Sequence, residues 1–170
     1  PTKRDRAIIQ SAQRLREQGQ STLLAWTTTP WTLPANTALA VNKDLTYAEV
    51  KVGDEQFILA KSLLEKVLQD EKHQPLPYEI VCELKGDELV GLSYEPLLGV
   101  DRGEGAHKVW AADYVSHEDG TGIVHLAPAY GEEDFELARK NNIPVVHTID
   151  ENGYFTKSDW TGRNVWETNK

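Results

Sequence analysis

The sequence predicts an α+β fold that is mainly β, with a β-barrel-like core of short strands and with helices packed outside it. Many short segments rich in β-forming residues follow one another, and few helical stretches separate them. Glycine and proline turn signals fall between these segments at short intervals. With 170 residues, 39% of them hydrophobic, the chain has the composition of an ordinary globular domain, and one core is the default expectation.

The elements expected in the N-terminal half follow from local periodicity. Residues 5–18 predict an amphipathic helix with a mostly basic outer side, and residues 21–29 predict a strand. Two prolines then indicate a loop over residues 30–36. Further strands are predicted at residues 38–41, 47–52, 57–60 and 78–84, with a hairpin turn at 52–55 and a helix at 61–68.

The C-terminal half is less regular. A polar loop at residues 69–77 and a mixed stretch at 88–105 are predicted to be irregular. Residues 132–141 predict a helix, because acidic residues occupy its first turn and basic residues its last. Strands are expected at residues 109–115 and 123–126, and a final strand pair at 145–149 and 154–156.

Charge and composition exclude several classes of protein. The chain has 18 Lys and Arg against 27 Asp and Glu, a net charge of −9, which argues against a broad basic face for nucleic acid. Cys82 is the only cysteine, so neither an internal disulfide nor a multi-thiolate zinc site is possible, and a reducing, cytoplasmic setting fits best. No apolar run approaches the roughly 20 residues of a membrane span. Because the chain starts at Pro1 and contains no methionine, we expect a domain excised from a longer protein.

The first candidate functional segment is Trp26-Thr27-Thr28-Thr29-Pro30-Trp31-Thr32-Leu33-Pro34-Ala35-Asn36. Consecutive threonines at the end of a strand place hydroxyl groups on both faces, and the two tryptophans supply flat apolar walls. Such a site could hold a nucleotide. An edge strand running into a proline-stiffened loop is the structural alternative, and the residues alone leave it open.

The second candidate segment covers residues 120–134, with His125 near the end of a strand and Asp134 in the first turn of the next helix. Strand ends and helix N-termini commonly carry functional side chains. A hydrogen-bonded structural histidine and an aspartate that interacts with the helix dipole are the simpler alternatives. Residues 111–138 contain seven acidic residues and no Lys or Arg, which indicates either a solvated acidic face or a site for a cation such as an ammonium group.

Two other chemistries have weaker support. The histidines lack the spacing of known metal motifs, so we expect surface histidines and no bound metal at His107, His117, His125 and His147. A Ser or Thr nucleophile with His125 as its base stays open, although no nucleophile-elbow motif is present.

Together, WTTTPWTLPAN and GTGIVHLAPAYGEEDFE closely resemble the two signature peptides of the editing domain inserted into the class I aminoacyl-tRNA synthetases for isoleucine, valine and leucine. The likeness extends from Ser21 to the closing GRNVWETNK. His125 is similar to the isoleucyl type, since valyl enzymes typically have Lys there and leucyl enzymes Met. The resemblance implies the editing-domain fold and water attack on the ester of valine attached to tRNA(Ile), and possibly on valyl-adenylate.

The resemblance also implies a role for each motif residue. Asp134 would bind the α-ammonium group, and His125 would form the wall that admits valine and rejects isoleucine. The hydroxyls of Thr27, Thr28 and Thr29 would hold the terminal adenosine and the ester, with Thr28 and Thr29 in the catalytic set. Trp26 would line the pocket and Asn36 would help to place the water. No metal, general base or covalent intermediate is expected.

The same resemblance predicts the organisation of the chain. Residues 1–20 would be a helical connection from the synthetase body, 21–160 the editing domain and 161–170 the return connection. The expected partners are the aminoacylated 3′-terminal adenosine of tRNA(Ile) and the rest of a cytoplasmic synthetase, with no membrane. No cofactor is expected in this domain, because ATP is used in the synthetase body. A tRNA 3′-end binding module without hydrolysis, and a valyl- or leucyl-type editing domain, are the alternatives.

Overall fold

The computed structural model describes residues 21–98 and 102–167, and these divide into two compact units. The described part of the first unit comprises residues 21–26, 40–92 and 110–124, and that of the second comprises 27–39, 93–98, 102–109 and 125–167. The helix predicted at residues 5–18 lies outside the described residues. No helix in the described ranges is long and apolar enough to cross a membrane.

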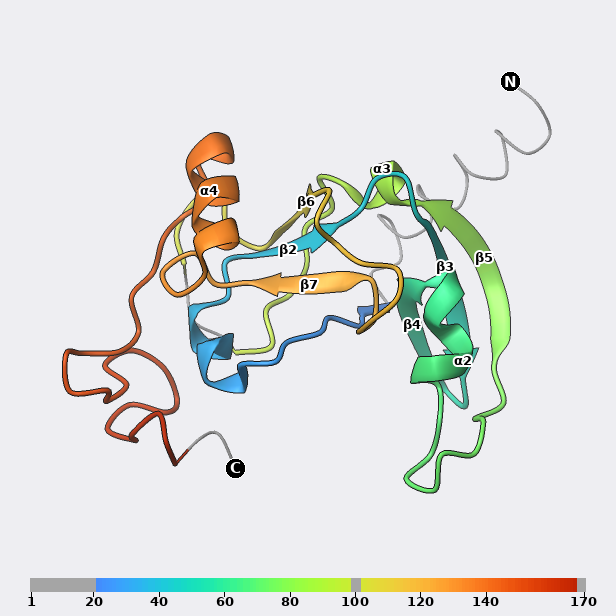
Figure 1. The fold of residues 1–170 in the computed structure, drawn as a ribbon, viewed down its shortest axis with the longest axis horizontal. Coiled ribbons are helices and arrows are strands. Elements are labelled where there is room, and N and C mark those ends of the chain that lie inside the picture. The colour runs from blue at the N-terminus through green and yellow to red at the C-terminus, as the bar shows by residue number, and fades with distance from the viewer. Residues whose placement is uncertain (1–20, 99–101, 168–170) are drawn as a thin grey trace. The chain divides into compact units, whose positions relative to one another are not determined.

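A four-stranded sheet forms the first unit, with the order β1-β4-β3-β5 (Figure 1). Its strands are β1 (Thr22–Leu23), β4 (Glu55–Ala60), β3 (Thr46–Val52) and β5 (Glu79–Lys85). β3 pairs antiparallel with both β4 and β5, whereas β1 pairs parallel with β4. The predicted hairpin is confirmed: Val52 pairs with Glu55, and Gly53 between them has a φ of 61°, which glycine adopts without strain.

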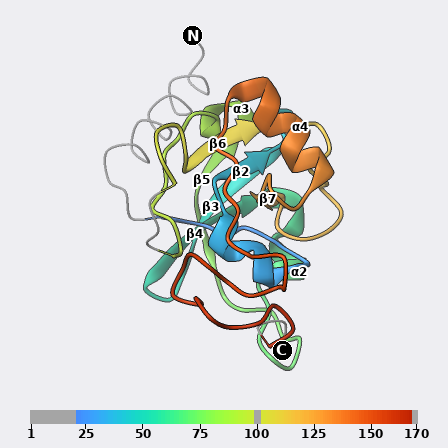
Figure 2. The ribbon, with the colours of Figure 1, turned by 90° about the vertical axis from the view of Figure 1, so that its left-hand side faces the viewer.

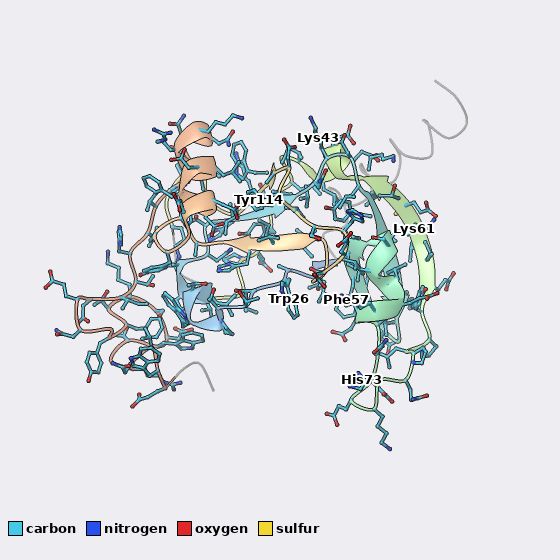
Figure 3. All side chains as sticks on the ribbon, viewed as in Figure 1. Trp26, Lys43, Phe57, Lys61, His73 and Tyr114 are labelled. Atoms are coloured by element: carbon cyan, nitrogen blue, oxygen red, sulfur yellow. The ribbon has the colours of Figure 1, made fainter. Side chains whose placement is uncertain are left out.

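Short helices cover this sheet. The helical spacing at residues 61–68 gives a 3₁₀ turn, η2 (Lys61–Leu63), followed by α2 (Leu64–Val67). Leu64 and Leu68 pack with Ala48, Val50 and Leu59 in a buried apolar cluster. A further short helix, α3 (Gly86–Leu89), follows β5, and His73 lies at the tip of the loop between α2 and β5 (Figure 3).

A three-stranded sheet has the order β6-β2-β7, and Figure 2 shows β2 between its neighbours. Its strands are β6 (Lys108–Ala111), β2 (Ala38–Val41) and β7 (Ile123–Leu126). All four residues of β2 are buried, in keeping with its unbroken apolar sequence. Each strand of this sheet has residues in both units. The second unit contains the 3₁₀ helix η1 (Pro30–Ala35) and α4 (Glu132–Asn141), the longest helix among the described residues.

The mixed, mainly β fold class is confirmed, but both sheets are open, so "barrel-like" describes the core only loosely. The bounds predicted for β2, β7 and α4 are those of the structure. The segment predicted as a loop after Thr29 is the helix η1 instead. β6 ends at Ala111, short of the predicted residue 115.

Two strand predictions were wrong because side-chain hydroxyl groups accept backbone N–H groups that a strand ladder would use. In the segment 21–29, only β1 and a bridge at Trp26 are extended, because the Thr27 hydroxyl accepts the backbone N–H of Thr29 in a turn. The final strand pair is reduced to one bridge, Ile149 with Phe155. The Tyr130 hydroxyl accepts the backbone N–H groups of both Thr148 and Ile149, which removes them from a strand ladder.

Candidate functional site

Most of the predicted site residues belong to the second unit, where η1, the last two residues of β7 and the start of α4 carry them. Thr27, Thr28 and Thr29 precede η1, and Asn36 follows it. His125 is the third residue of β7, and Asp134 is in the first turn of α4. Trp26 belongs to the first unit.

His125 is the buried centre of this site. Its side chain is among the buried polar groups, with 7% exposed, so the expectation of a surface histidine was wrong at this position. Both ring nitrogens are hydrogen-bonded: Nδ1 lies 2.8 Å from Asn36 Nδ2, and Nε2 lies 2.9 Å from Thr32 Oγ1. The ring is therefore held from both sides.

The hydrogen bonds of Asn36 determine which nitrogen of His125 carries the proton. Asn36 Nδ2 also lies 2.8 Å from the carbonyl oxygen of Ala38 and 3.3 Å from that of Leu126, and both carbonyls can only accept. The amide nitrogen must therefore face them, so it donates to His125 Nδ1 as well. His125 Nδ1 is then unprotonated and Nε2–H donates to Thr32.

The chain of hydrogen bonds continues from Thr32 in the same direction. Thr32 Oγ1 donates to the carbonyl oxygen of Thr29 at 2.8 Å, and its side chain is buried. This orientation decides the question of a nucleophile activated by His125. Because Nε2 carries the proton, it cannot take one from Thr32, and the lone pair of Nδ1 is already occupied by Asn36. A Thr32–His125 nucleophile pair is not formed.

The protonation state of His125 agrees with this arrangement. Burial lowers the pKa of His125 to about 4, because an imidazolium would lose its hydration. Protonation at Nδ1 would also set two N–H donors, those of His125 and Asn36, against each other. His125 is therefore a neutral, oriented ring at physiological pH.

The threonines before η1 are more accessible. Thr28 and Thr29 are exposed and Thr27 is half-buried. The Thr29 hydroxyl lies 3.5 Å from the hydroxyls of both Thr27 and Thr32, and the Thr28 hydroxyl has no hydrogen bond to any described residue. These groups form a short row of hydroxyls whose outer members are available to a ligand.

Asp134 is a partly buried carboxylate near the end of β7. Its Oδ2 accepts the backbone N–H of Ala127 at 2.8 Å, two residues after His125. Burial raises the pKa of Asp134, although the Ala127 hydrogen bond acts in the opposite direction. Gly131 makes room for this contact, because a Cβ there would lie 2.9 Å from Asp134 Oδ2.

In the first unit, the Trp26 side chain is 51% exposed and projects away from the strands (Figure 3). Its indole packs on the turn at Gly120, where a Cβ would lie 2.8 Å from Trp26 Cγ. The described residues contain no group of three or more His, Cys, Asp or Glu side chains that could hold a metal ion.

The sequence did not point to Thr32, Tyr94 or the Ala127 N–H group as parts of this site. Thr32 lies in the first candidate segment, and its distance of three residues from Thr29 would place both on one side of a 3₁₀ turn. Tyr94, whose hydroxyl donates to Asn36 Oδ1 at 2.5 Å, falls in the stretch predicted to be irregular. No sequence signal there indicated it.

Comparison with known proteins gives the family. Residues 15–167 match the family model described as "Leucyl-tRNA synthetase, editing domain". The chain belongs to this editing-domain family. Its match covers all of the residues that the structure describes, including the site around His125.

Relatives of this editing domain include isoleucine–tRNA ligases. That of Clostridium tetani is 47% identical over 146 residues, which is 84% of this chain and 14% of the relative. That of Bdellovibrio bacteriovorus is 42% identical over 164 residues, covering 92% of this chain and 15% of the relative. The chain thus spans about a seventh of the length of these relatives. Because both relatives are isoleucine–tRNA ligases, they support the isoleucyl type of editing domain that His125 suggested.

Solved structures show the same fold for the editing domain. The crystal structure of GlLeuRS-CP1 has a TM-score of 0.70 at 15% identity, covering 99% of this chain and 85% of that one. The P. falciparum cytosolic leucyl-tRNA synthetase editing domain has a TM-score of 0.69 at 12% identity, with coverages of 88% and 73%.

Proposed function

We propose that this chain hydrolyses the ester that joins valine to the 3′-terminal adenosine of tRNA(Ile), so that it removes a synthesis error of an isoleucine–tRNA ligase. The chemical need is general. A pocket built for isoleucine rejects valine by one methylene, worth about 1–3 kcal/mol, and this amino-acid pair is the standard example of that limit. A second site that accepts only the smaller side chain removes the error. Valyl-adenylate, a mixed anhydride in which water attacks the same aminoacyl carbonyl carbon and releases AMP, is a second proposed substrate.

The observation that carries the proposal is the carboxylate of Asp134. It is partly buried, burial raises its pKa, and no Lys or Arg side chain among the described residues forms an ion pair with it. An anion in such a place is stabilised by a cation that arrives with the ligand. The α-ammonium group of an aminoacyl ester is such a cation, and it supplies a charge-assisted hydrogen bond worth about 1.5–3 kcal/mol.

The other groups complete a hydrolytic site without a general base. The hydroxyls of Thr28 and Thr29 bind the adenosine and the ester and stabilise the oxyanion that forms when water attacks. The water is oriented by these hydroxyls and by the ribose hydroxyl next to the ester. Asn36 helps to place the water through Oδ1, because its amide nitrogen already donates to His125 and to backbone carbonyls. Only Oδ1 can accept a further hydrogen bond.

His125 acts as the specificity wall in this proposal. Because two hydrogen bonds fix its ring and only 7% of its side chain is exposed, it offers one small rigid surface. A rigid wall discriminates against an added methylene better than a mobile one, since it cannot move aside at low cost. The indole of Trp26, in the first unit, is exposed and therefore available to a ligand.

The proposal extends to the setting of the domain. Residues 21–160 form the editing unit, and residues 1–20 and 161–170 connect it to the rest of a longer, cytoplasmic synthetase chain. That chain supplies the main tRNA-binding surface and uses ATP, which is consistent with the net charge of −9 here. Only the aminoacylated terminal adenosine enters this unit.

Deacylation of purified, valylated tRNA(Ile) by the 170-residue chain tests the proposal. We expect valine release well above the spontaneous rate, slower isoleucine release and no acyl-threonine adduct after rapid quench. In Asp134→Asn, the amide oxygen can still accept the Ala127 N–H, but the charge is lost, so kcat/KM falls about 10- to 100-fold. A tRNA ester of 2-hydroxy-3-methylbutanoate, which lacks the ammonium group, serves as the matched control and should be insensitive to this substitution.

Retained tRNA binding without any ester hydrolysis would instead identify a 3′-end binding module. If Asp134→Asn lowered kcat/KM equally for the amino ester and the hydroxy ester, the result would contradict the proposed contact between Asp134 and the ammonium group.

A further inference from the structure

Trp26, in the first unit, has a fixed backbone and an accessible ring. Its backbone N–H donates to the carbonyl oxygen of Ile123 at 2.8 Å, and Trp26 forms a parallel bridge with Val124. These contacts tie it to the first two residues of β7. The residue is nevertheless 51% exposed, and its indole points away from the strands (Figure 3). A large flat ring is thus held at the surface of the unit by the backbone behind it.

Gly120 supports one face of this indole. A Cβ at residue 120 would lie 2.8 Å from Trp26 Cγ, 2.9 Å from Cδ1 and 3.1 Å from Cβ. Cγ is bonded to both other atoms and is the nearest of the three, so this position lies over the face of the indole and not at its outer edge. The three atoms are at the near end of the side chain, and they cannot move aside unless the Trp26 backbone moves.

The turn that contains Gly120 is held on both sides within the first unit. Before Gly120, the Lys66 ammonium group donates to the Asp119 carboxylate at 2.6 Å. After it, the carbonyl oxygen of Thr121 accepts the backbone N–H of Ala60 at 2.8 Å. Gly120 itself has a φ of 70°, which glycine adopts without strain. The support under the indole is therefore part of the folded unit, and the ring is in position before a ligand binds.

We infer that Gly120 is a positioning residue, whose turn supports the inner face of the Trp26 indole and leaves the outer face as a stacking surface for a nucleobase. A base is flat, and stacking on a ring that is already fixed gains affinity without the cost of ordering that ring. The inference deepens the proposed function and rests on it for the identity of the base, which is the terminal adenine of the tRNA. The placement of Trp26 by Gly120 stands on the geometry alone.

Titration of the whole chain with adenosine, followed by proton NMR of the indole groups, is the direct test. The Trp26 signals are those lost in Trp26→Phe. In the parent protein they should move upfield as adenosine is added, because a stacked adenine shields the ring beneath it. Ribose, which lacks the base, is the matched control ligand and should leave them in place. Unmoved Trp26 signals, or an equal shift with ribose, would overturn the inference.

Gly120→Ala tests the support, and Gly53→Ala is its control. Gly53 also has a positive φ, of 61°, but a Cβ there would have no atom within 4 Å. Both substitutions therefore strain the backbone in the same way, and only the first also displaces the Trp26 ring. We expect Gly53→Ala to bind adenosine as the parent does, and Gly120→Ala to bind it about tenfold more weakly. Equal affinity of the two variants for adenosine would contradict the role of Gly120.

A double substitution keeps the test decisive if Gly120→Ala impairs folding. In a chain that carries Trp26→Ala, the Cβ added at residue 120 no longer meets the Cγ and Cδ1 atoms of an indole. Urea unfolding should then show that Gly120→Ala lowers stability much less in this background than in the parent, and by as much as Gly53→Ala does. An unfolded Gly120→Ala chain that folds once Trp26→Ala is added would support the contact equally. The same loss of stability in both backgrounds would refute it.

Deacylation of valylated tRNA(Ile) relates the stacking surface to the proposed function. The adenine is stacked equally in the bound substrate and in the transition state, so Trp26→Leu should raise KM about tenfold and leave kcat nearly unchanged. Adenosine stacking in a protein that never hydrolyses the ester would retain the stacking surface and reject the proposed hydrolysis. Hydrolysis with unmoved Trp26 signals and a KM unaffected by Trp26→Leu would reject the stacking surface alone.

Discussion

Acidification between pH 7 and pH 4 should destabilise this protein through His125. Its pKa is about 4 in the folded chain, against 6.5 for an ordinary histidine. In this range the unfolded chain binds a proton that the folded chain cannot, so the free energy of unfolding falls as the pH falls. Above pH 7 both states are neutral at this residue, and His125 contributes no pH dependence.

The size of the effect follows from the two pKa values. One pKa unit corresponds to about 1.4 kcal/mol, and the loss accumulates as the pH drops below 6.5. Relative to pH 7, the lost stability is about 1 kcal/mol at pH 6, about 2 kcal/mol at pH 5 and about 3 kcal/mol at pH 4. Raised carboxyl pKa values, such as that of Asp134, change stability in the opposite sense, so the total curve does not isolate His125.

Comparison with the His125→Gln variant separates the contribution of His125 to the pH dependence from that of the other titrating groups. Glutamine offers one amide donor and one carbonyl acceptor and does not titrate. Urea unfolding of both chains at pH 7, 6, 5 and 4 should show the advantage of the parent over the variant shrinking by about 3 kcal/mol in total. NMR titration gives the pKa of His125 directly. A stability difference independent of pH, or a His125 that titrates near 6.5, would refute the assignment of a neutral, doubly bonded ring.

Three further substitutions test other parts of the structure. His125→Ala should remove the wall and reduce the preference for valyl over isoleucyl ester by about tenfold or more, as measured by deacylation of the two charged tRNAs; unchanged selectivity would contradict the steric role. Alanine tolerates the φ of −124° at Gly131, so Gly131→Ala should act only through its added Cβ, which displaces the Asp134 carboxylate from its hydrogen bond. We expect a loss of about 1–2 kcal/mol in the free energy of unfolding, measured by thermal unfolding, and a parallel loss of deacylation. Full activity in that variant would show that the carboxylate has another position. Gly86→Ala should be the most damaging, by about 3 kcal/mol in urea unfolding, since its Cβ would lie 2.0 Å from the backbone oxygen of Asn42; a stable variant would mean that this turn shifts easily.

Sequence reasoning succeeded where structure depends on local pattern. The bounds of β2, β7 and α4 were predictable because unbroken apolar runs and charged helix ends report on their own segments. The strand pair at residues 145–156 failed because its outcome depends on the Tyr130 hydroxyl, a side chain at least 15 residues away. A periodic pattern contains no information about such a competitor for backbone N–H groups.

In the candidate site, too, local sequence features were predictable and contacts between distant residues were not. The two peptides that carry His125, Asn36 and Asp134 were recognisable as sequence, and the structure connects the first two by a hydrogen bond. The protonation of His125 was not predictable, because it is set by the Asn36 amide, which the backbone carbonyls of Ala38 and Leu126 orient. Both the burial and the tautomer of a histidine are properties of the assembled unit.

The two prolines of η1 have a consequence for the energetics of binding. Pro30 stands at the first position of this helix and Pro34 within it, so the backbone between the threonines and Asn36 is restricted even before folding. Less conformational entropy is then lost when this segment becomes ordered. When the proposed substrate binds hydroxyl groups on such a segment, little of its binding free energy is lost in ordering the backbone. More of that binding free energy can then contribute to discrimination between side chains that differ by one methylene.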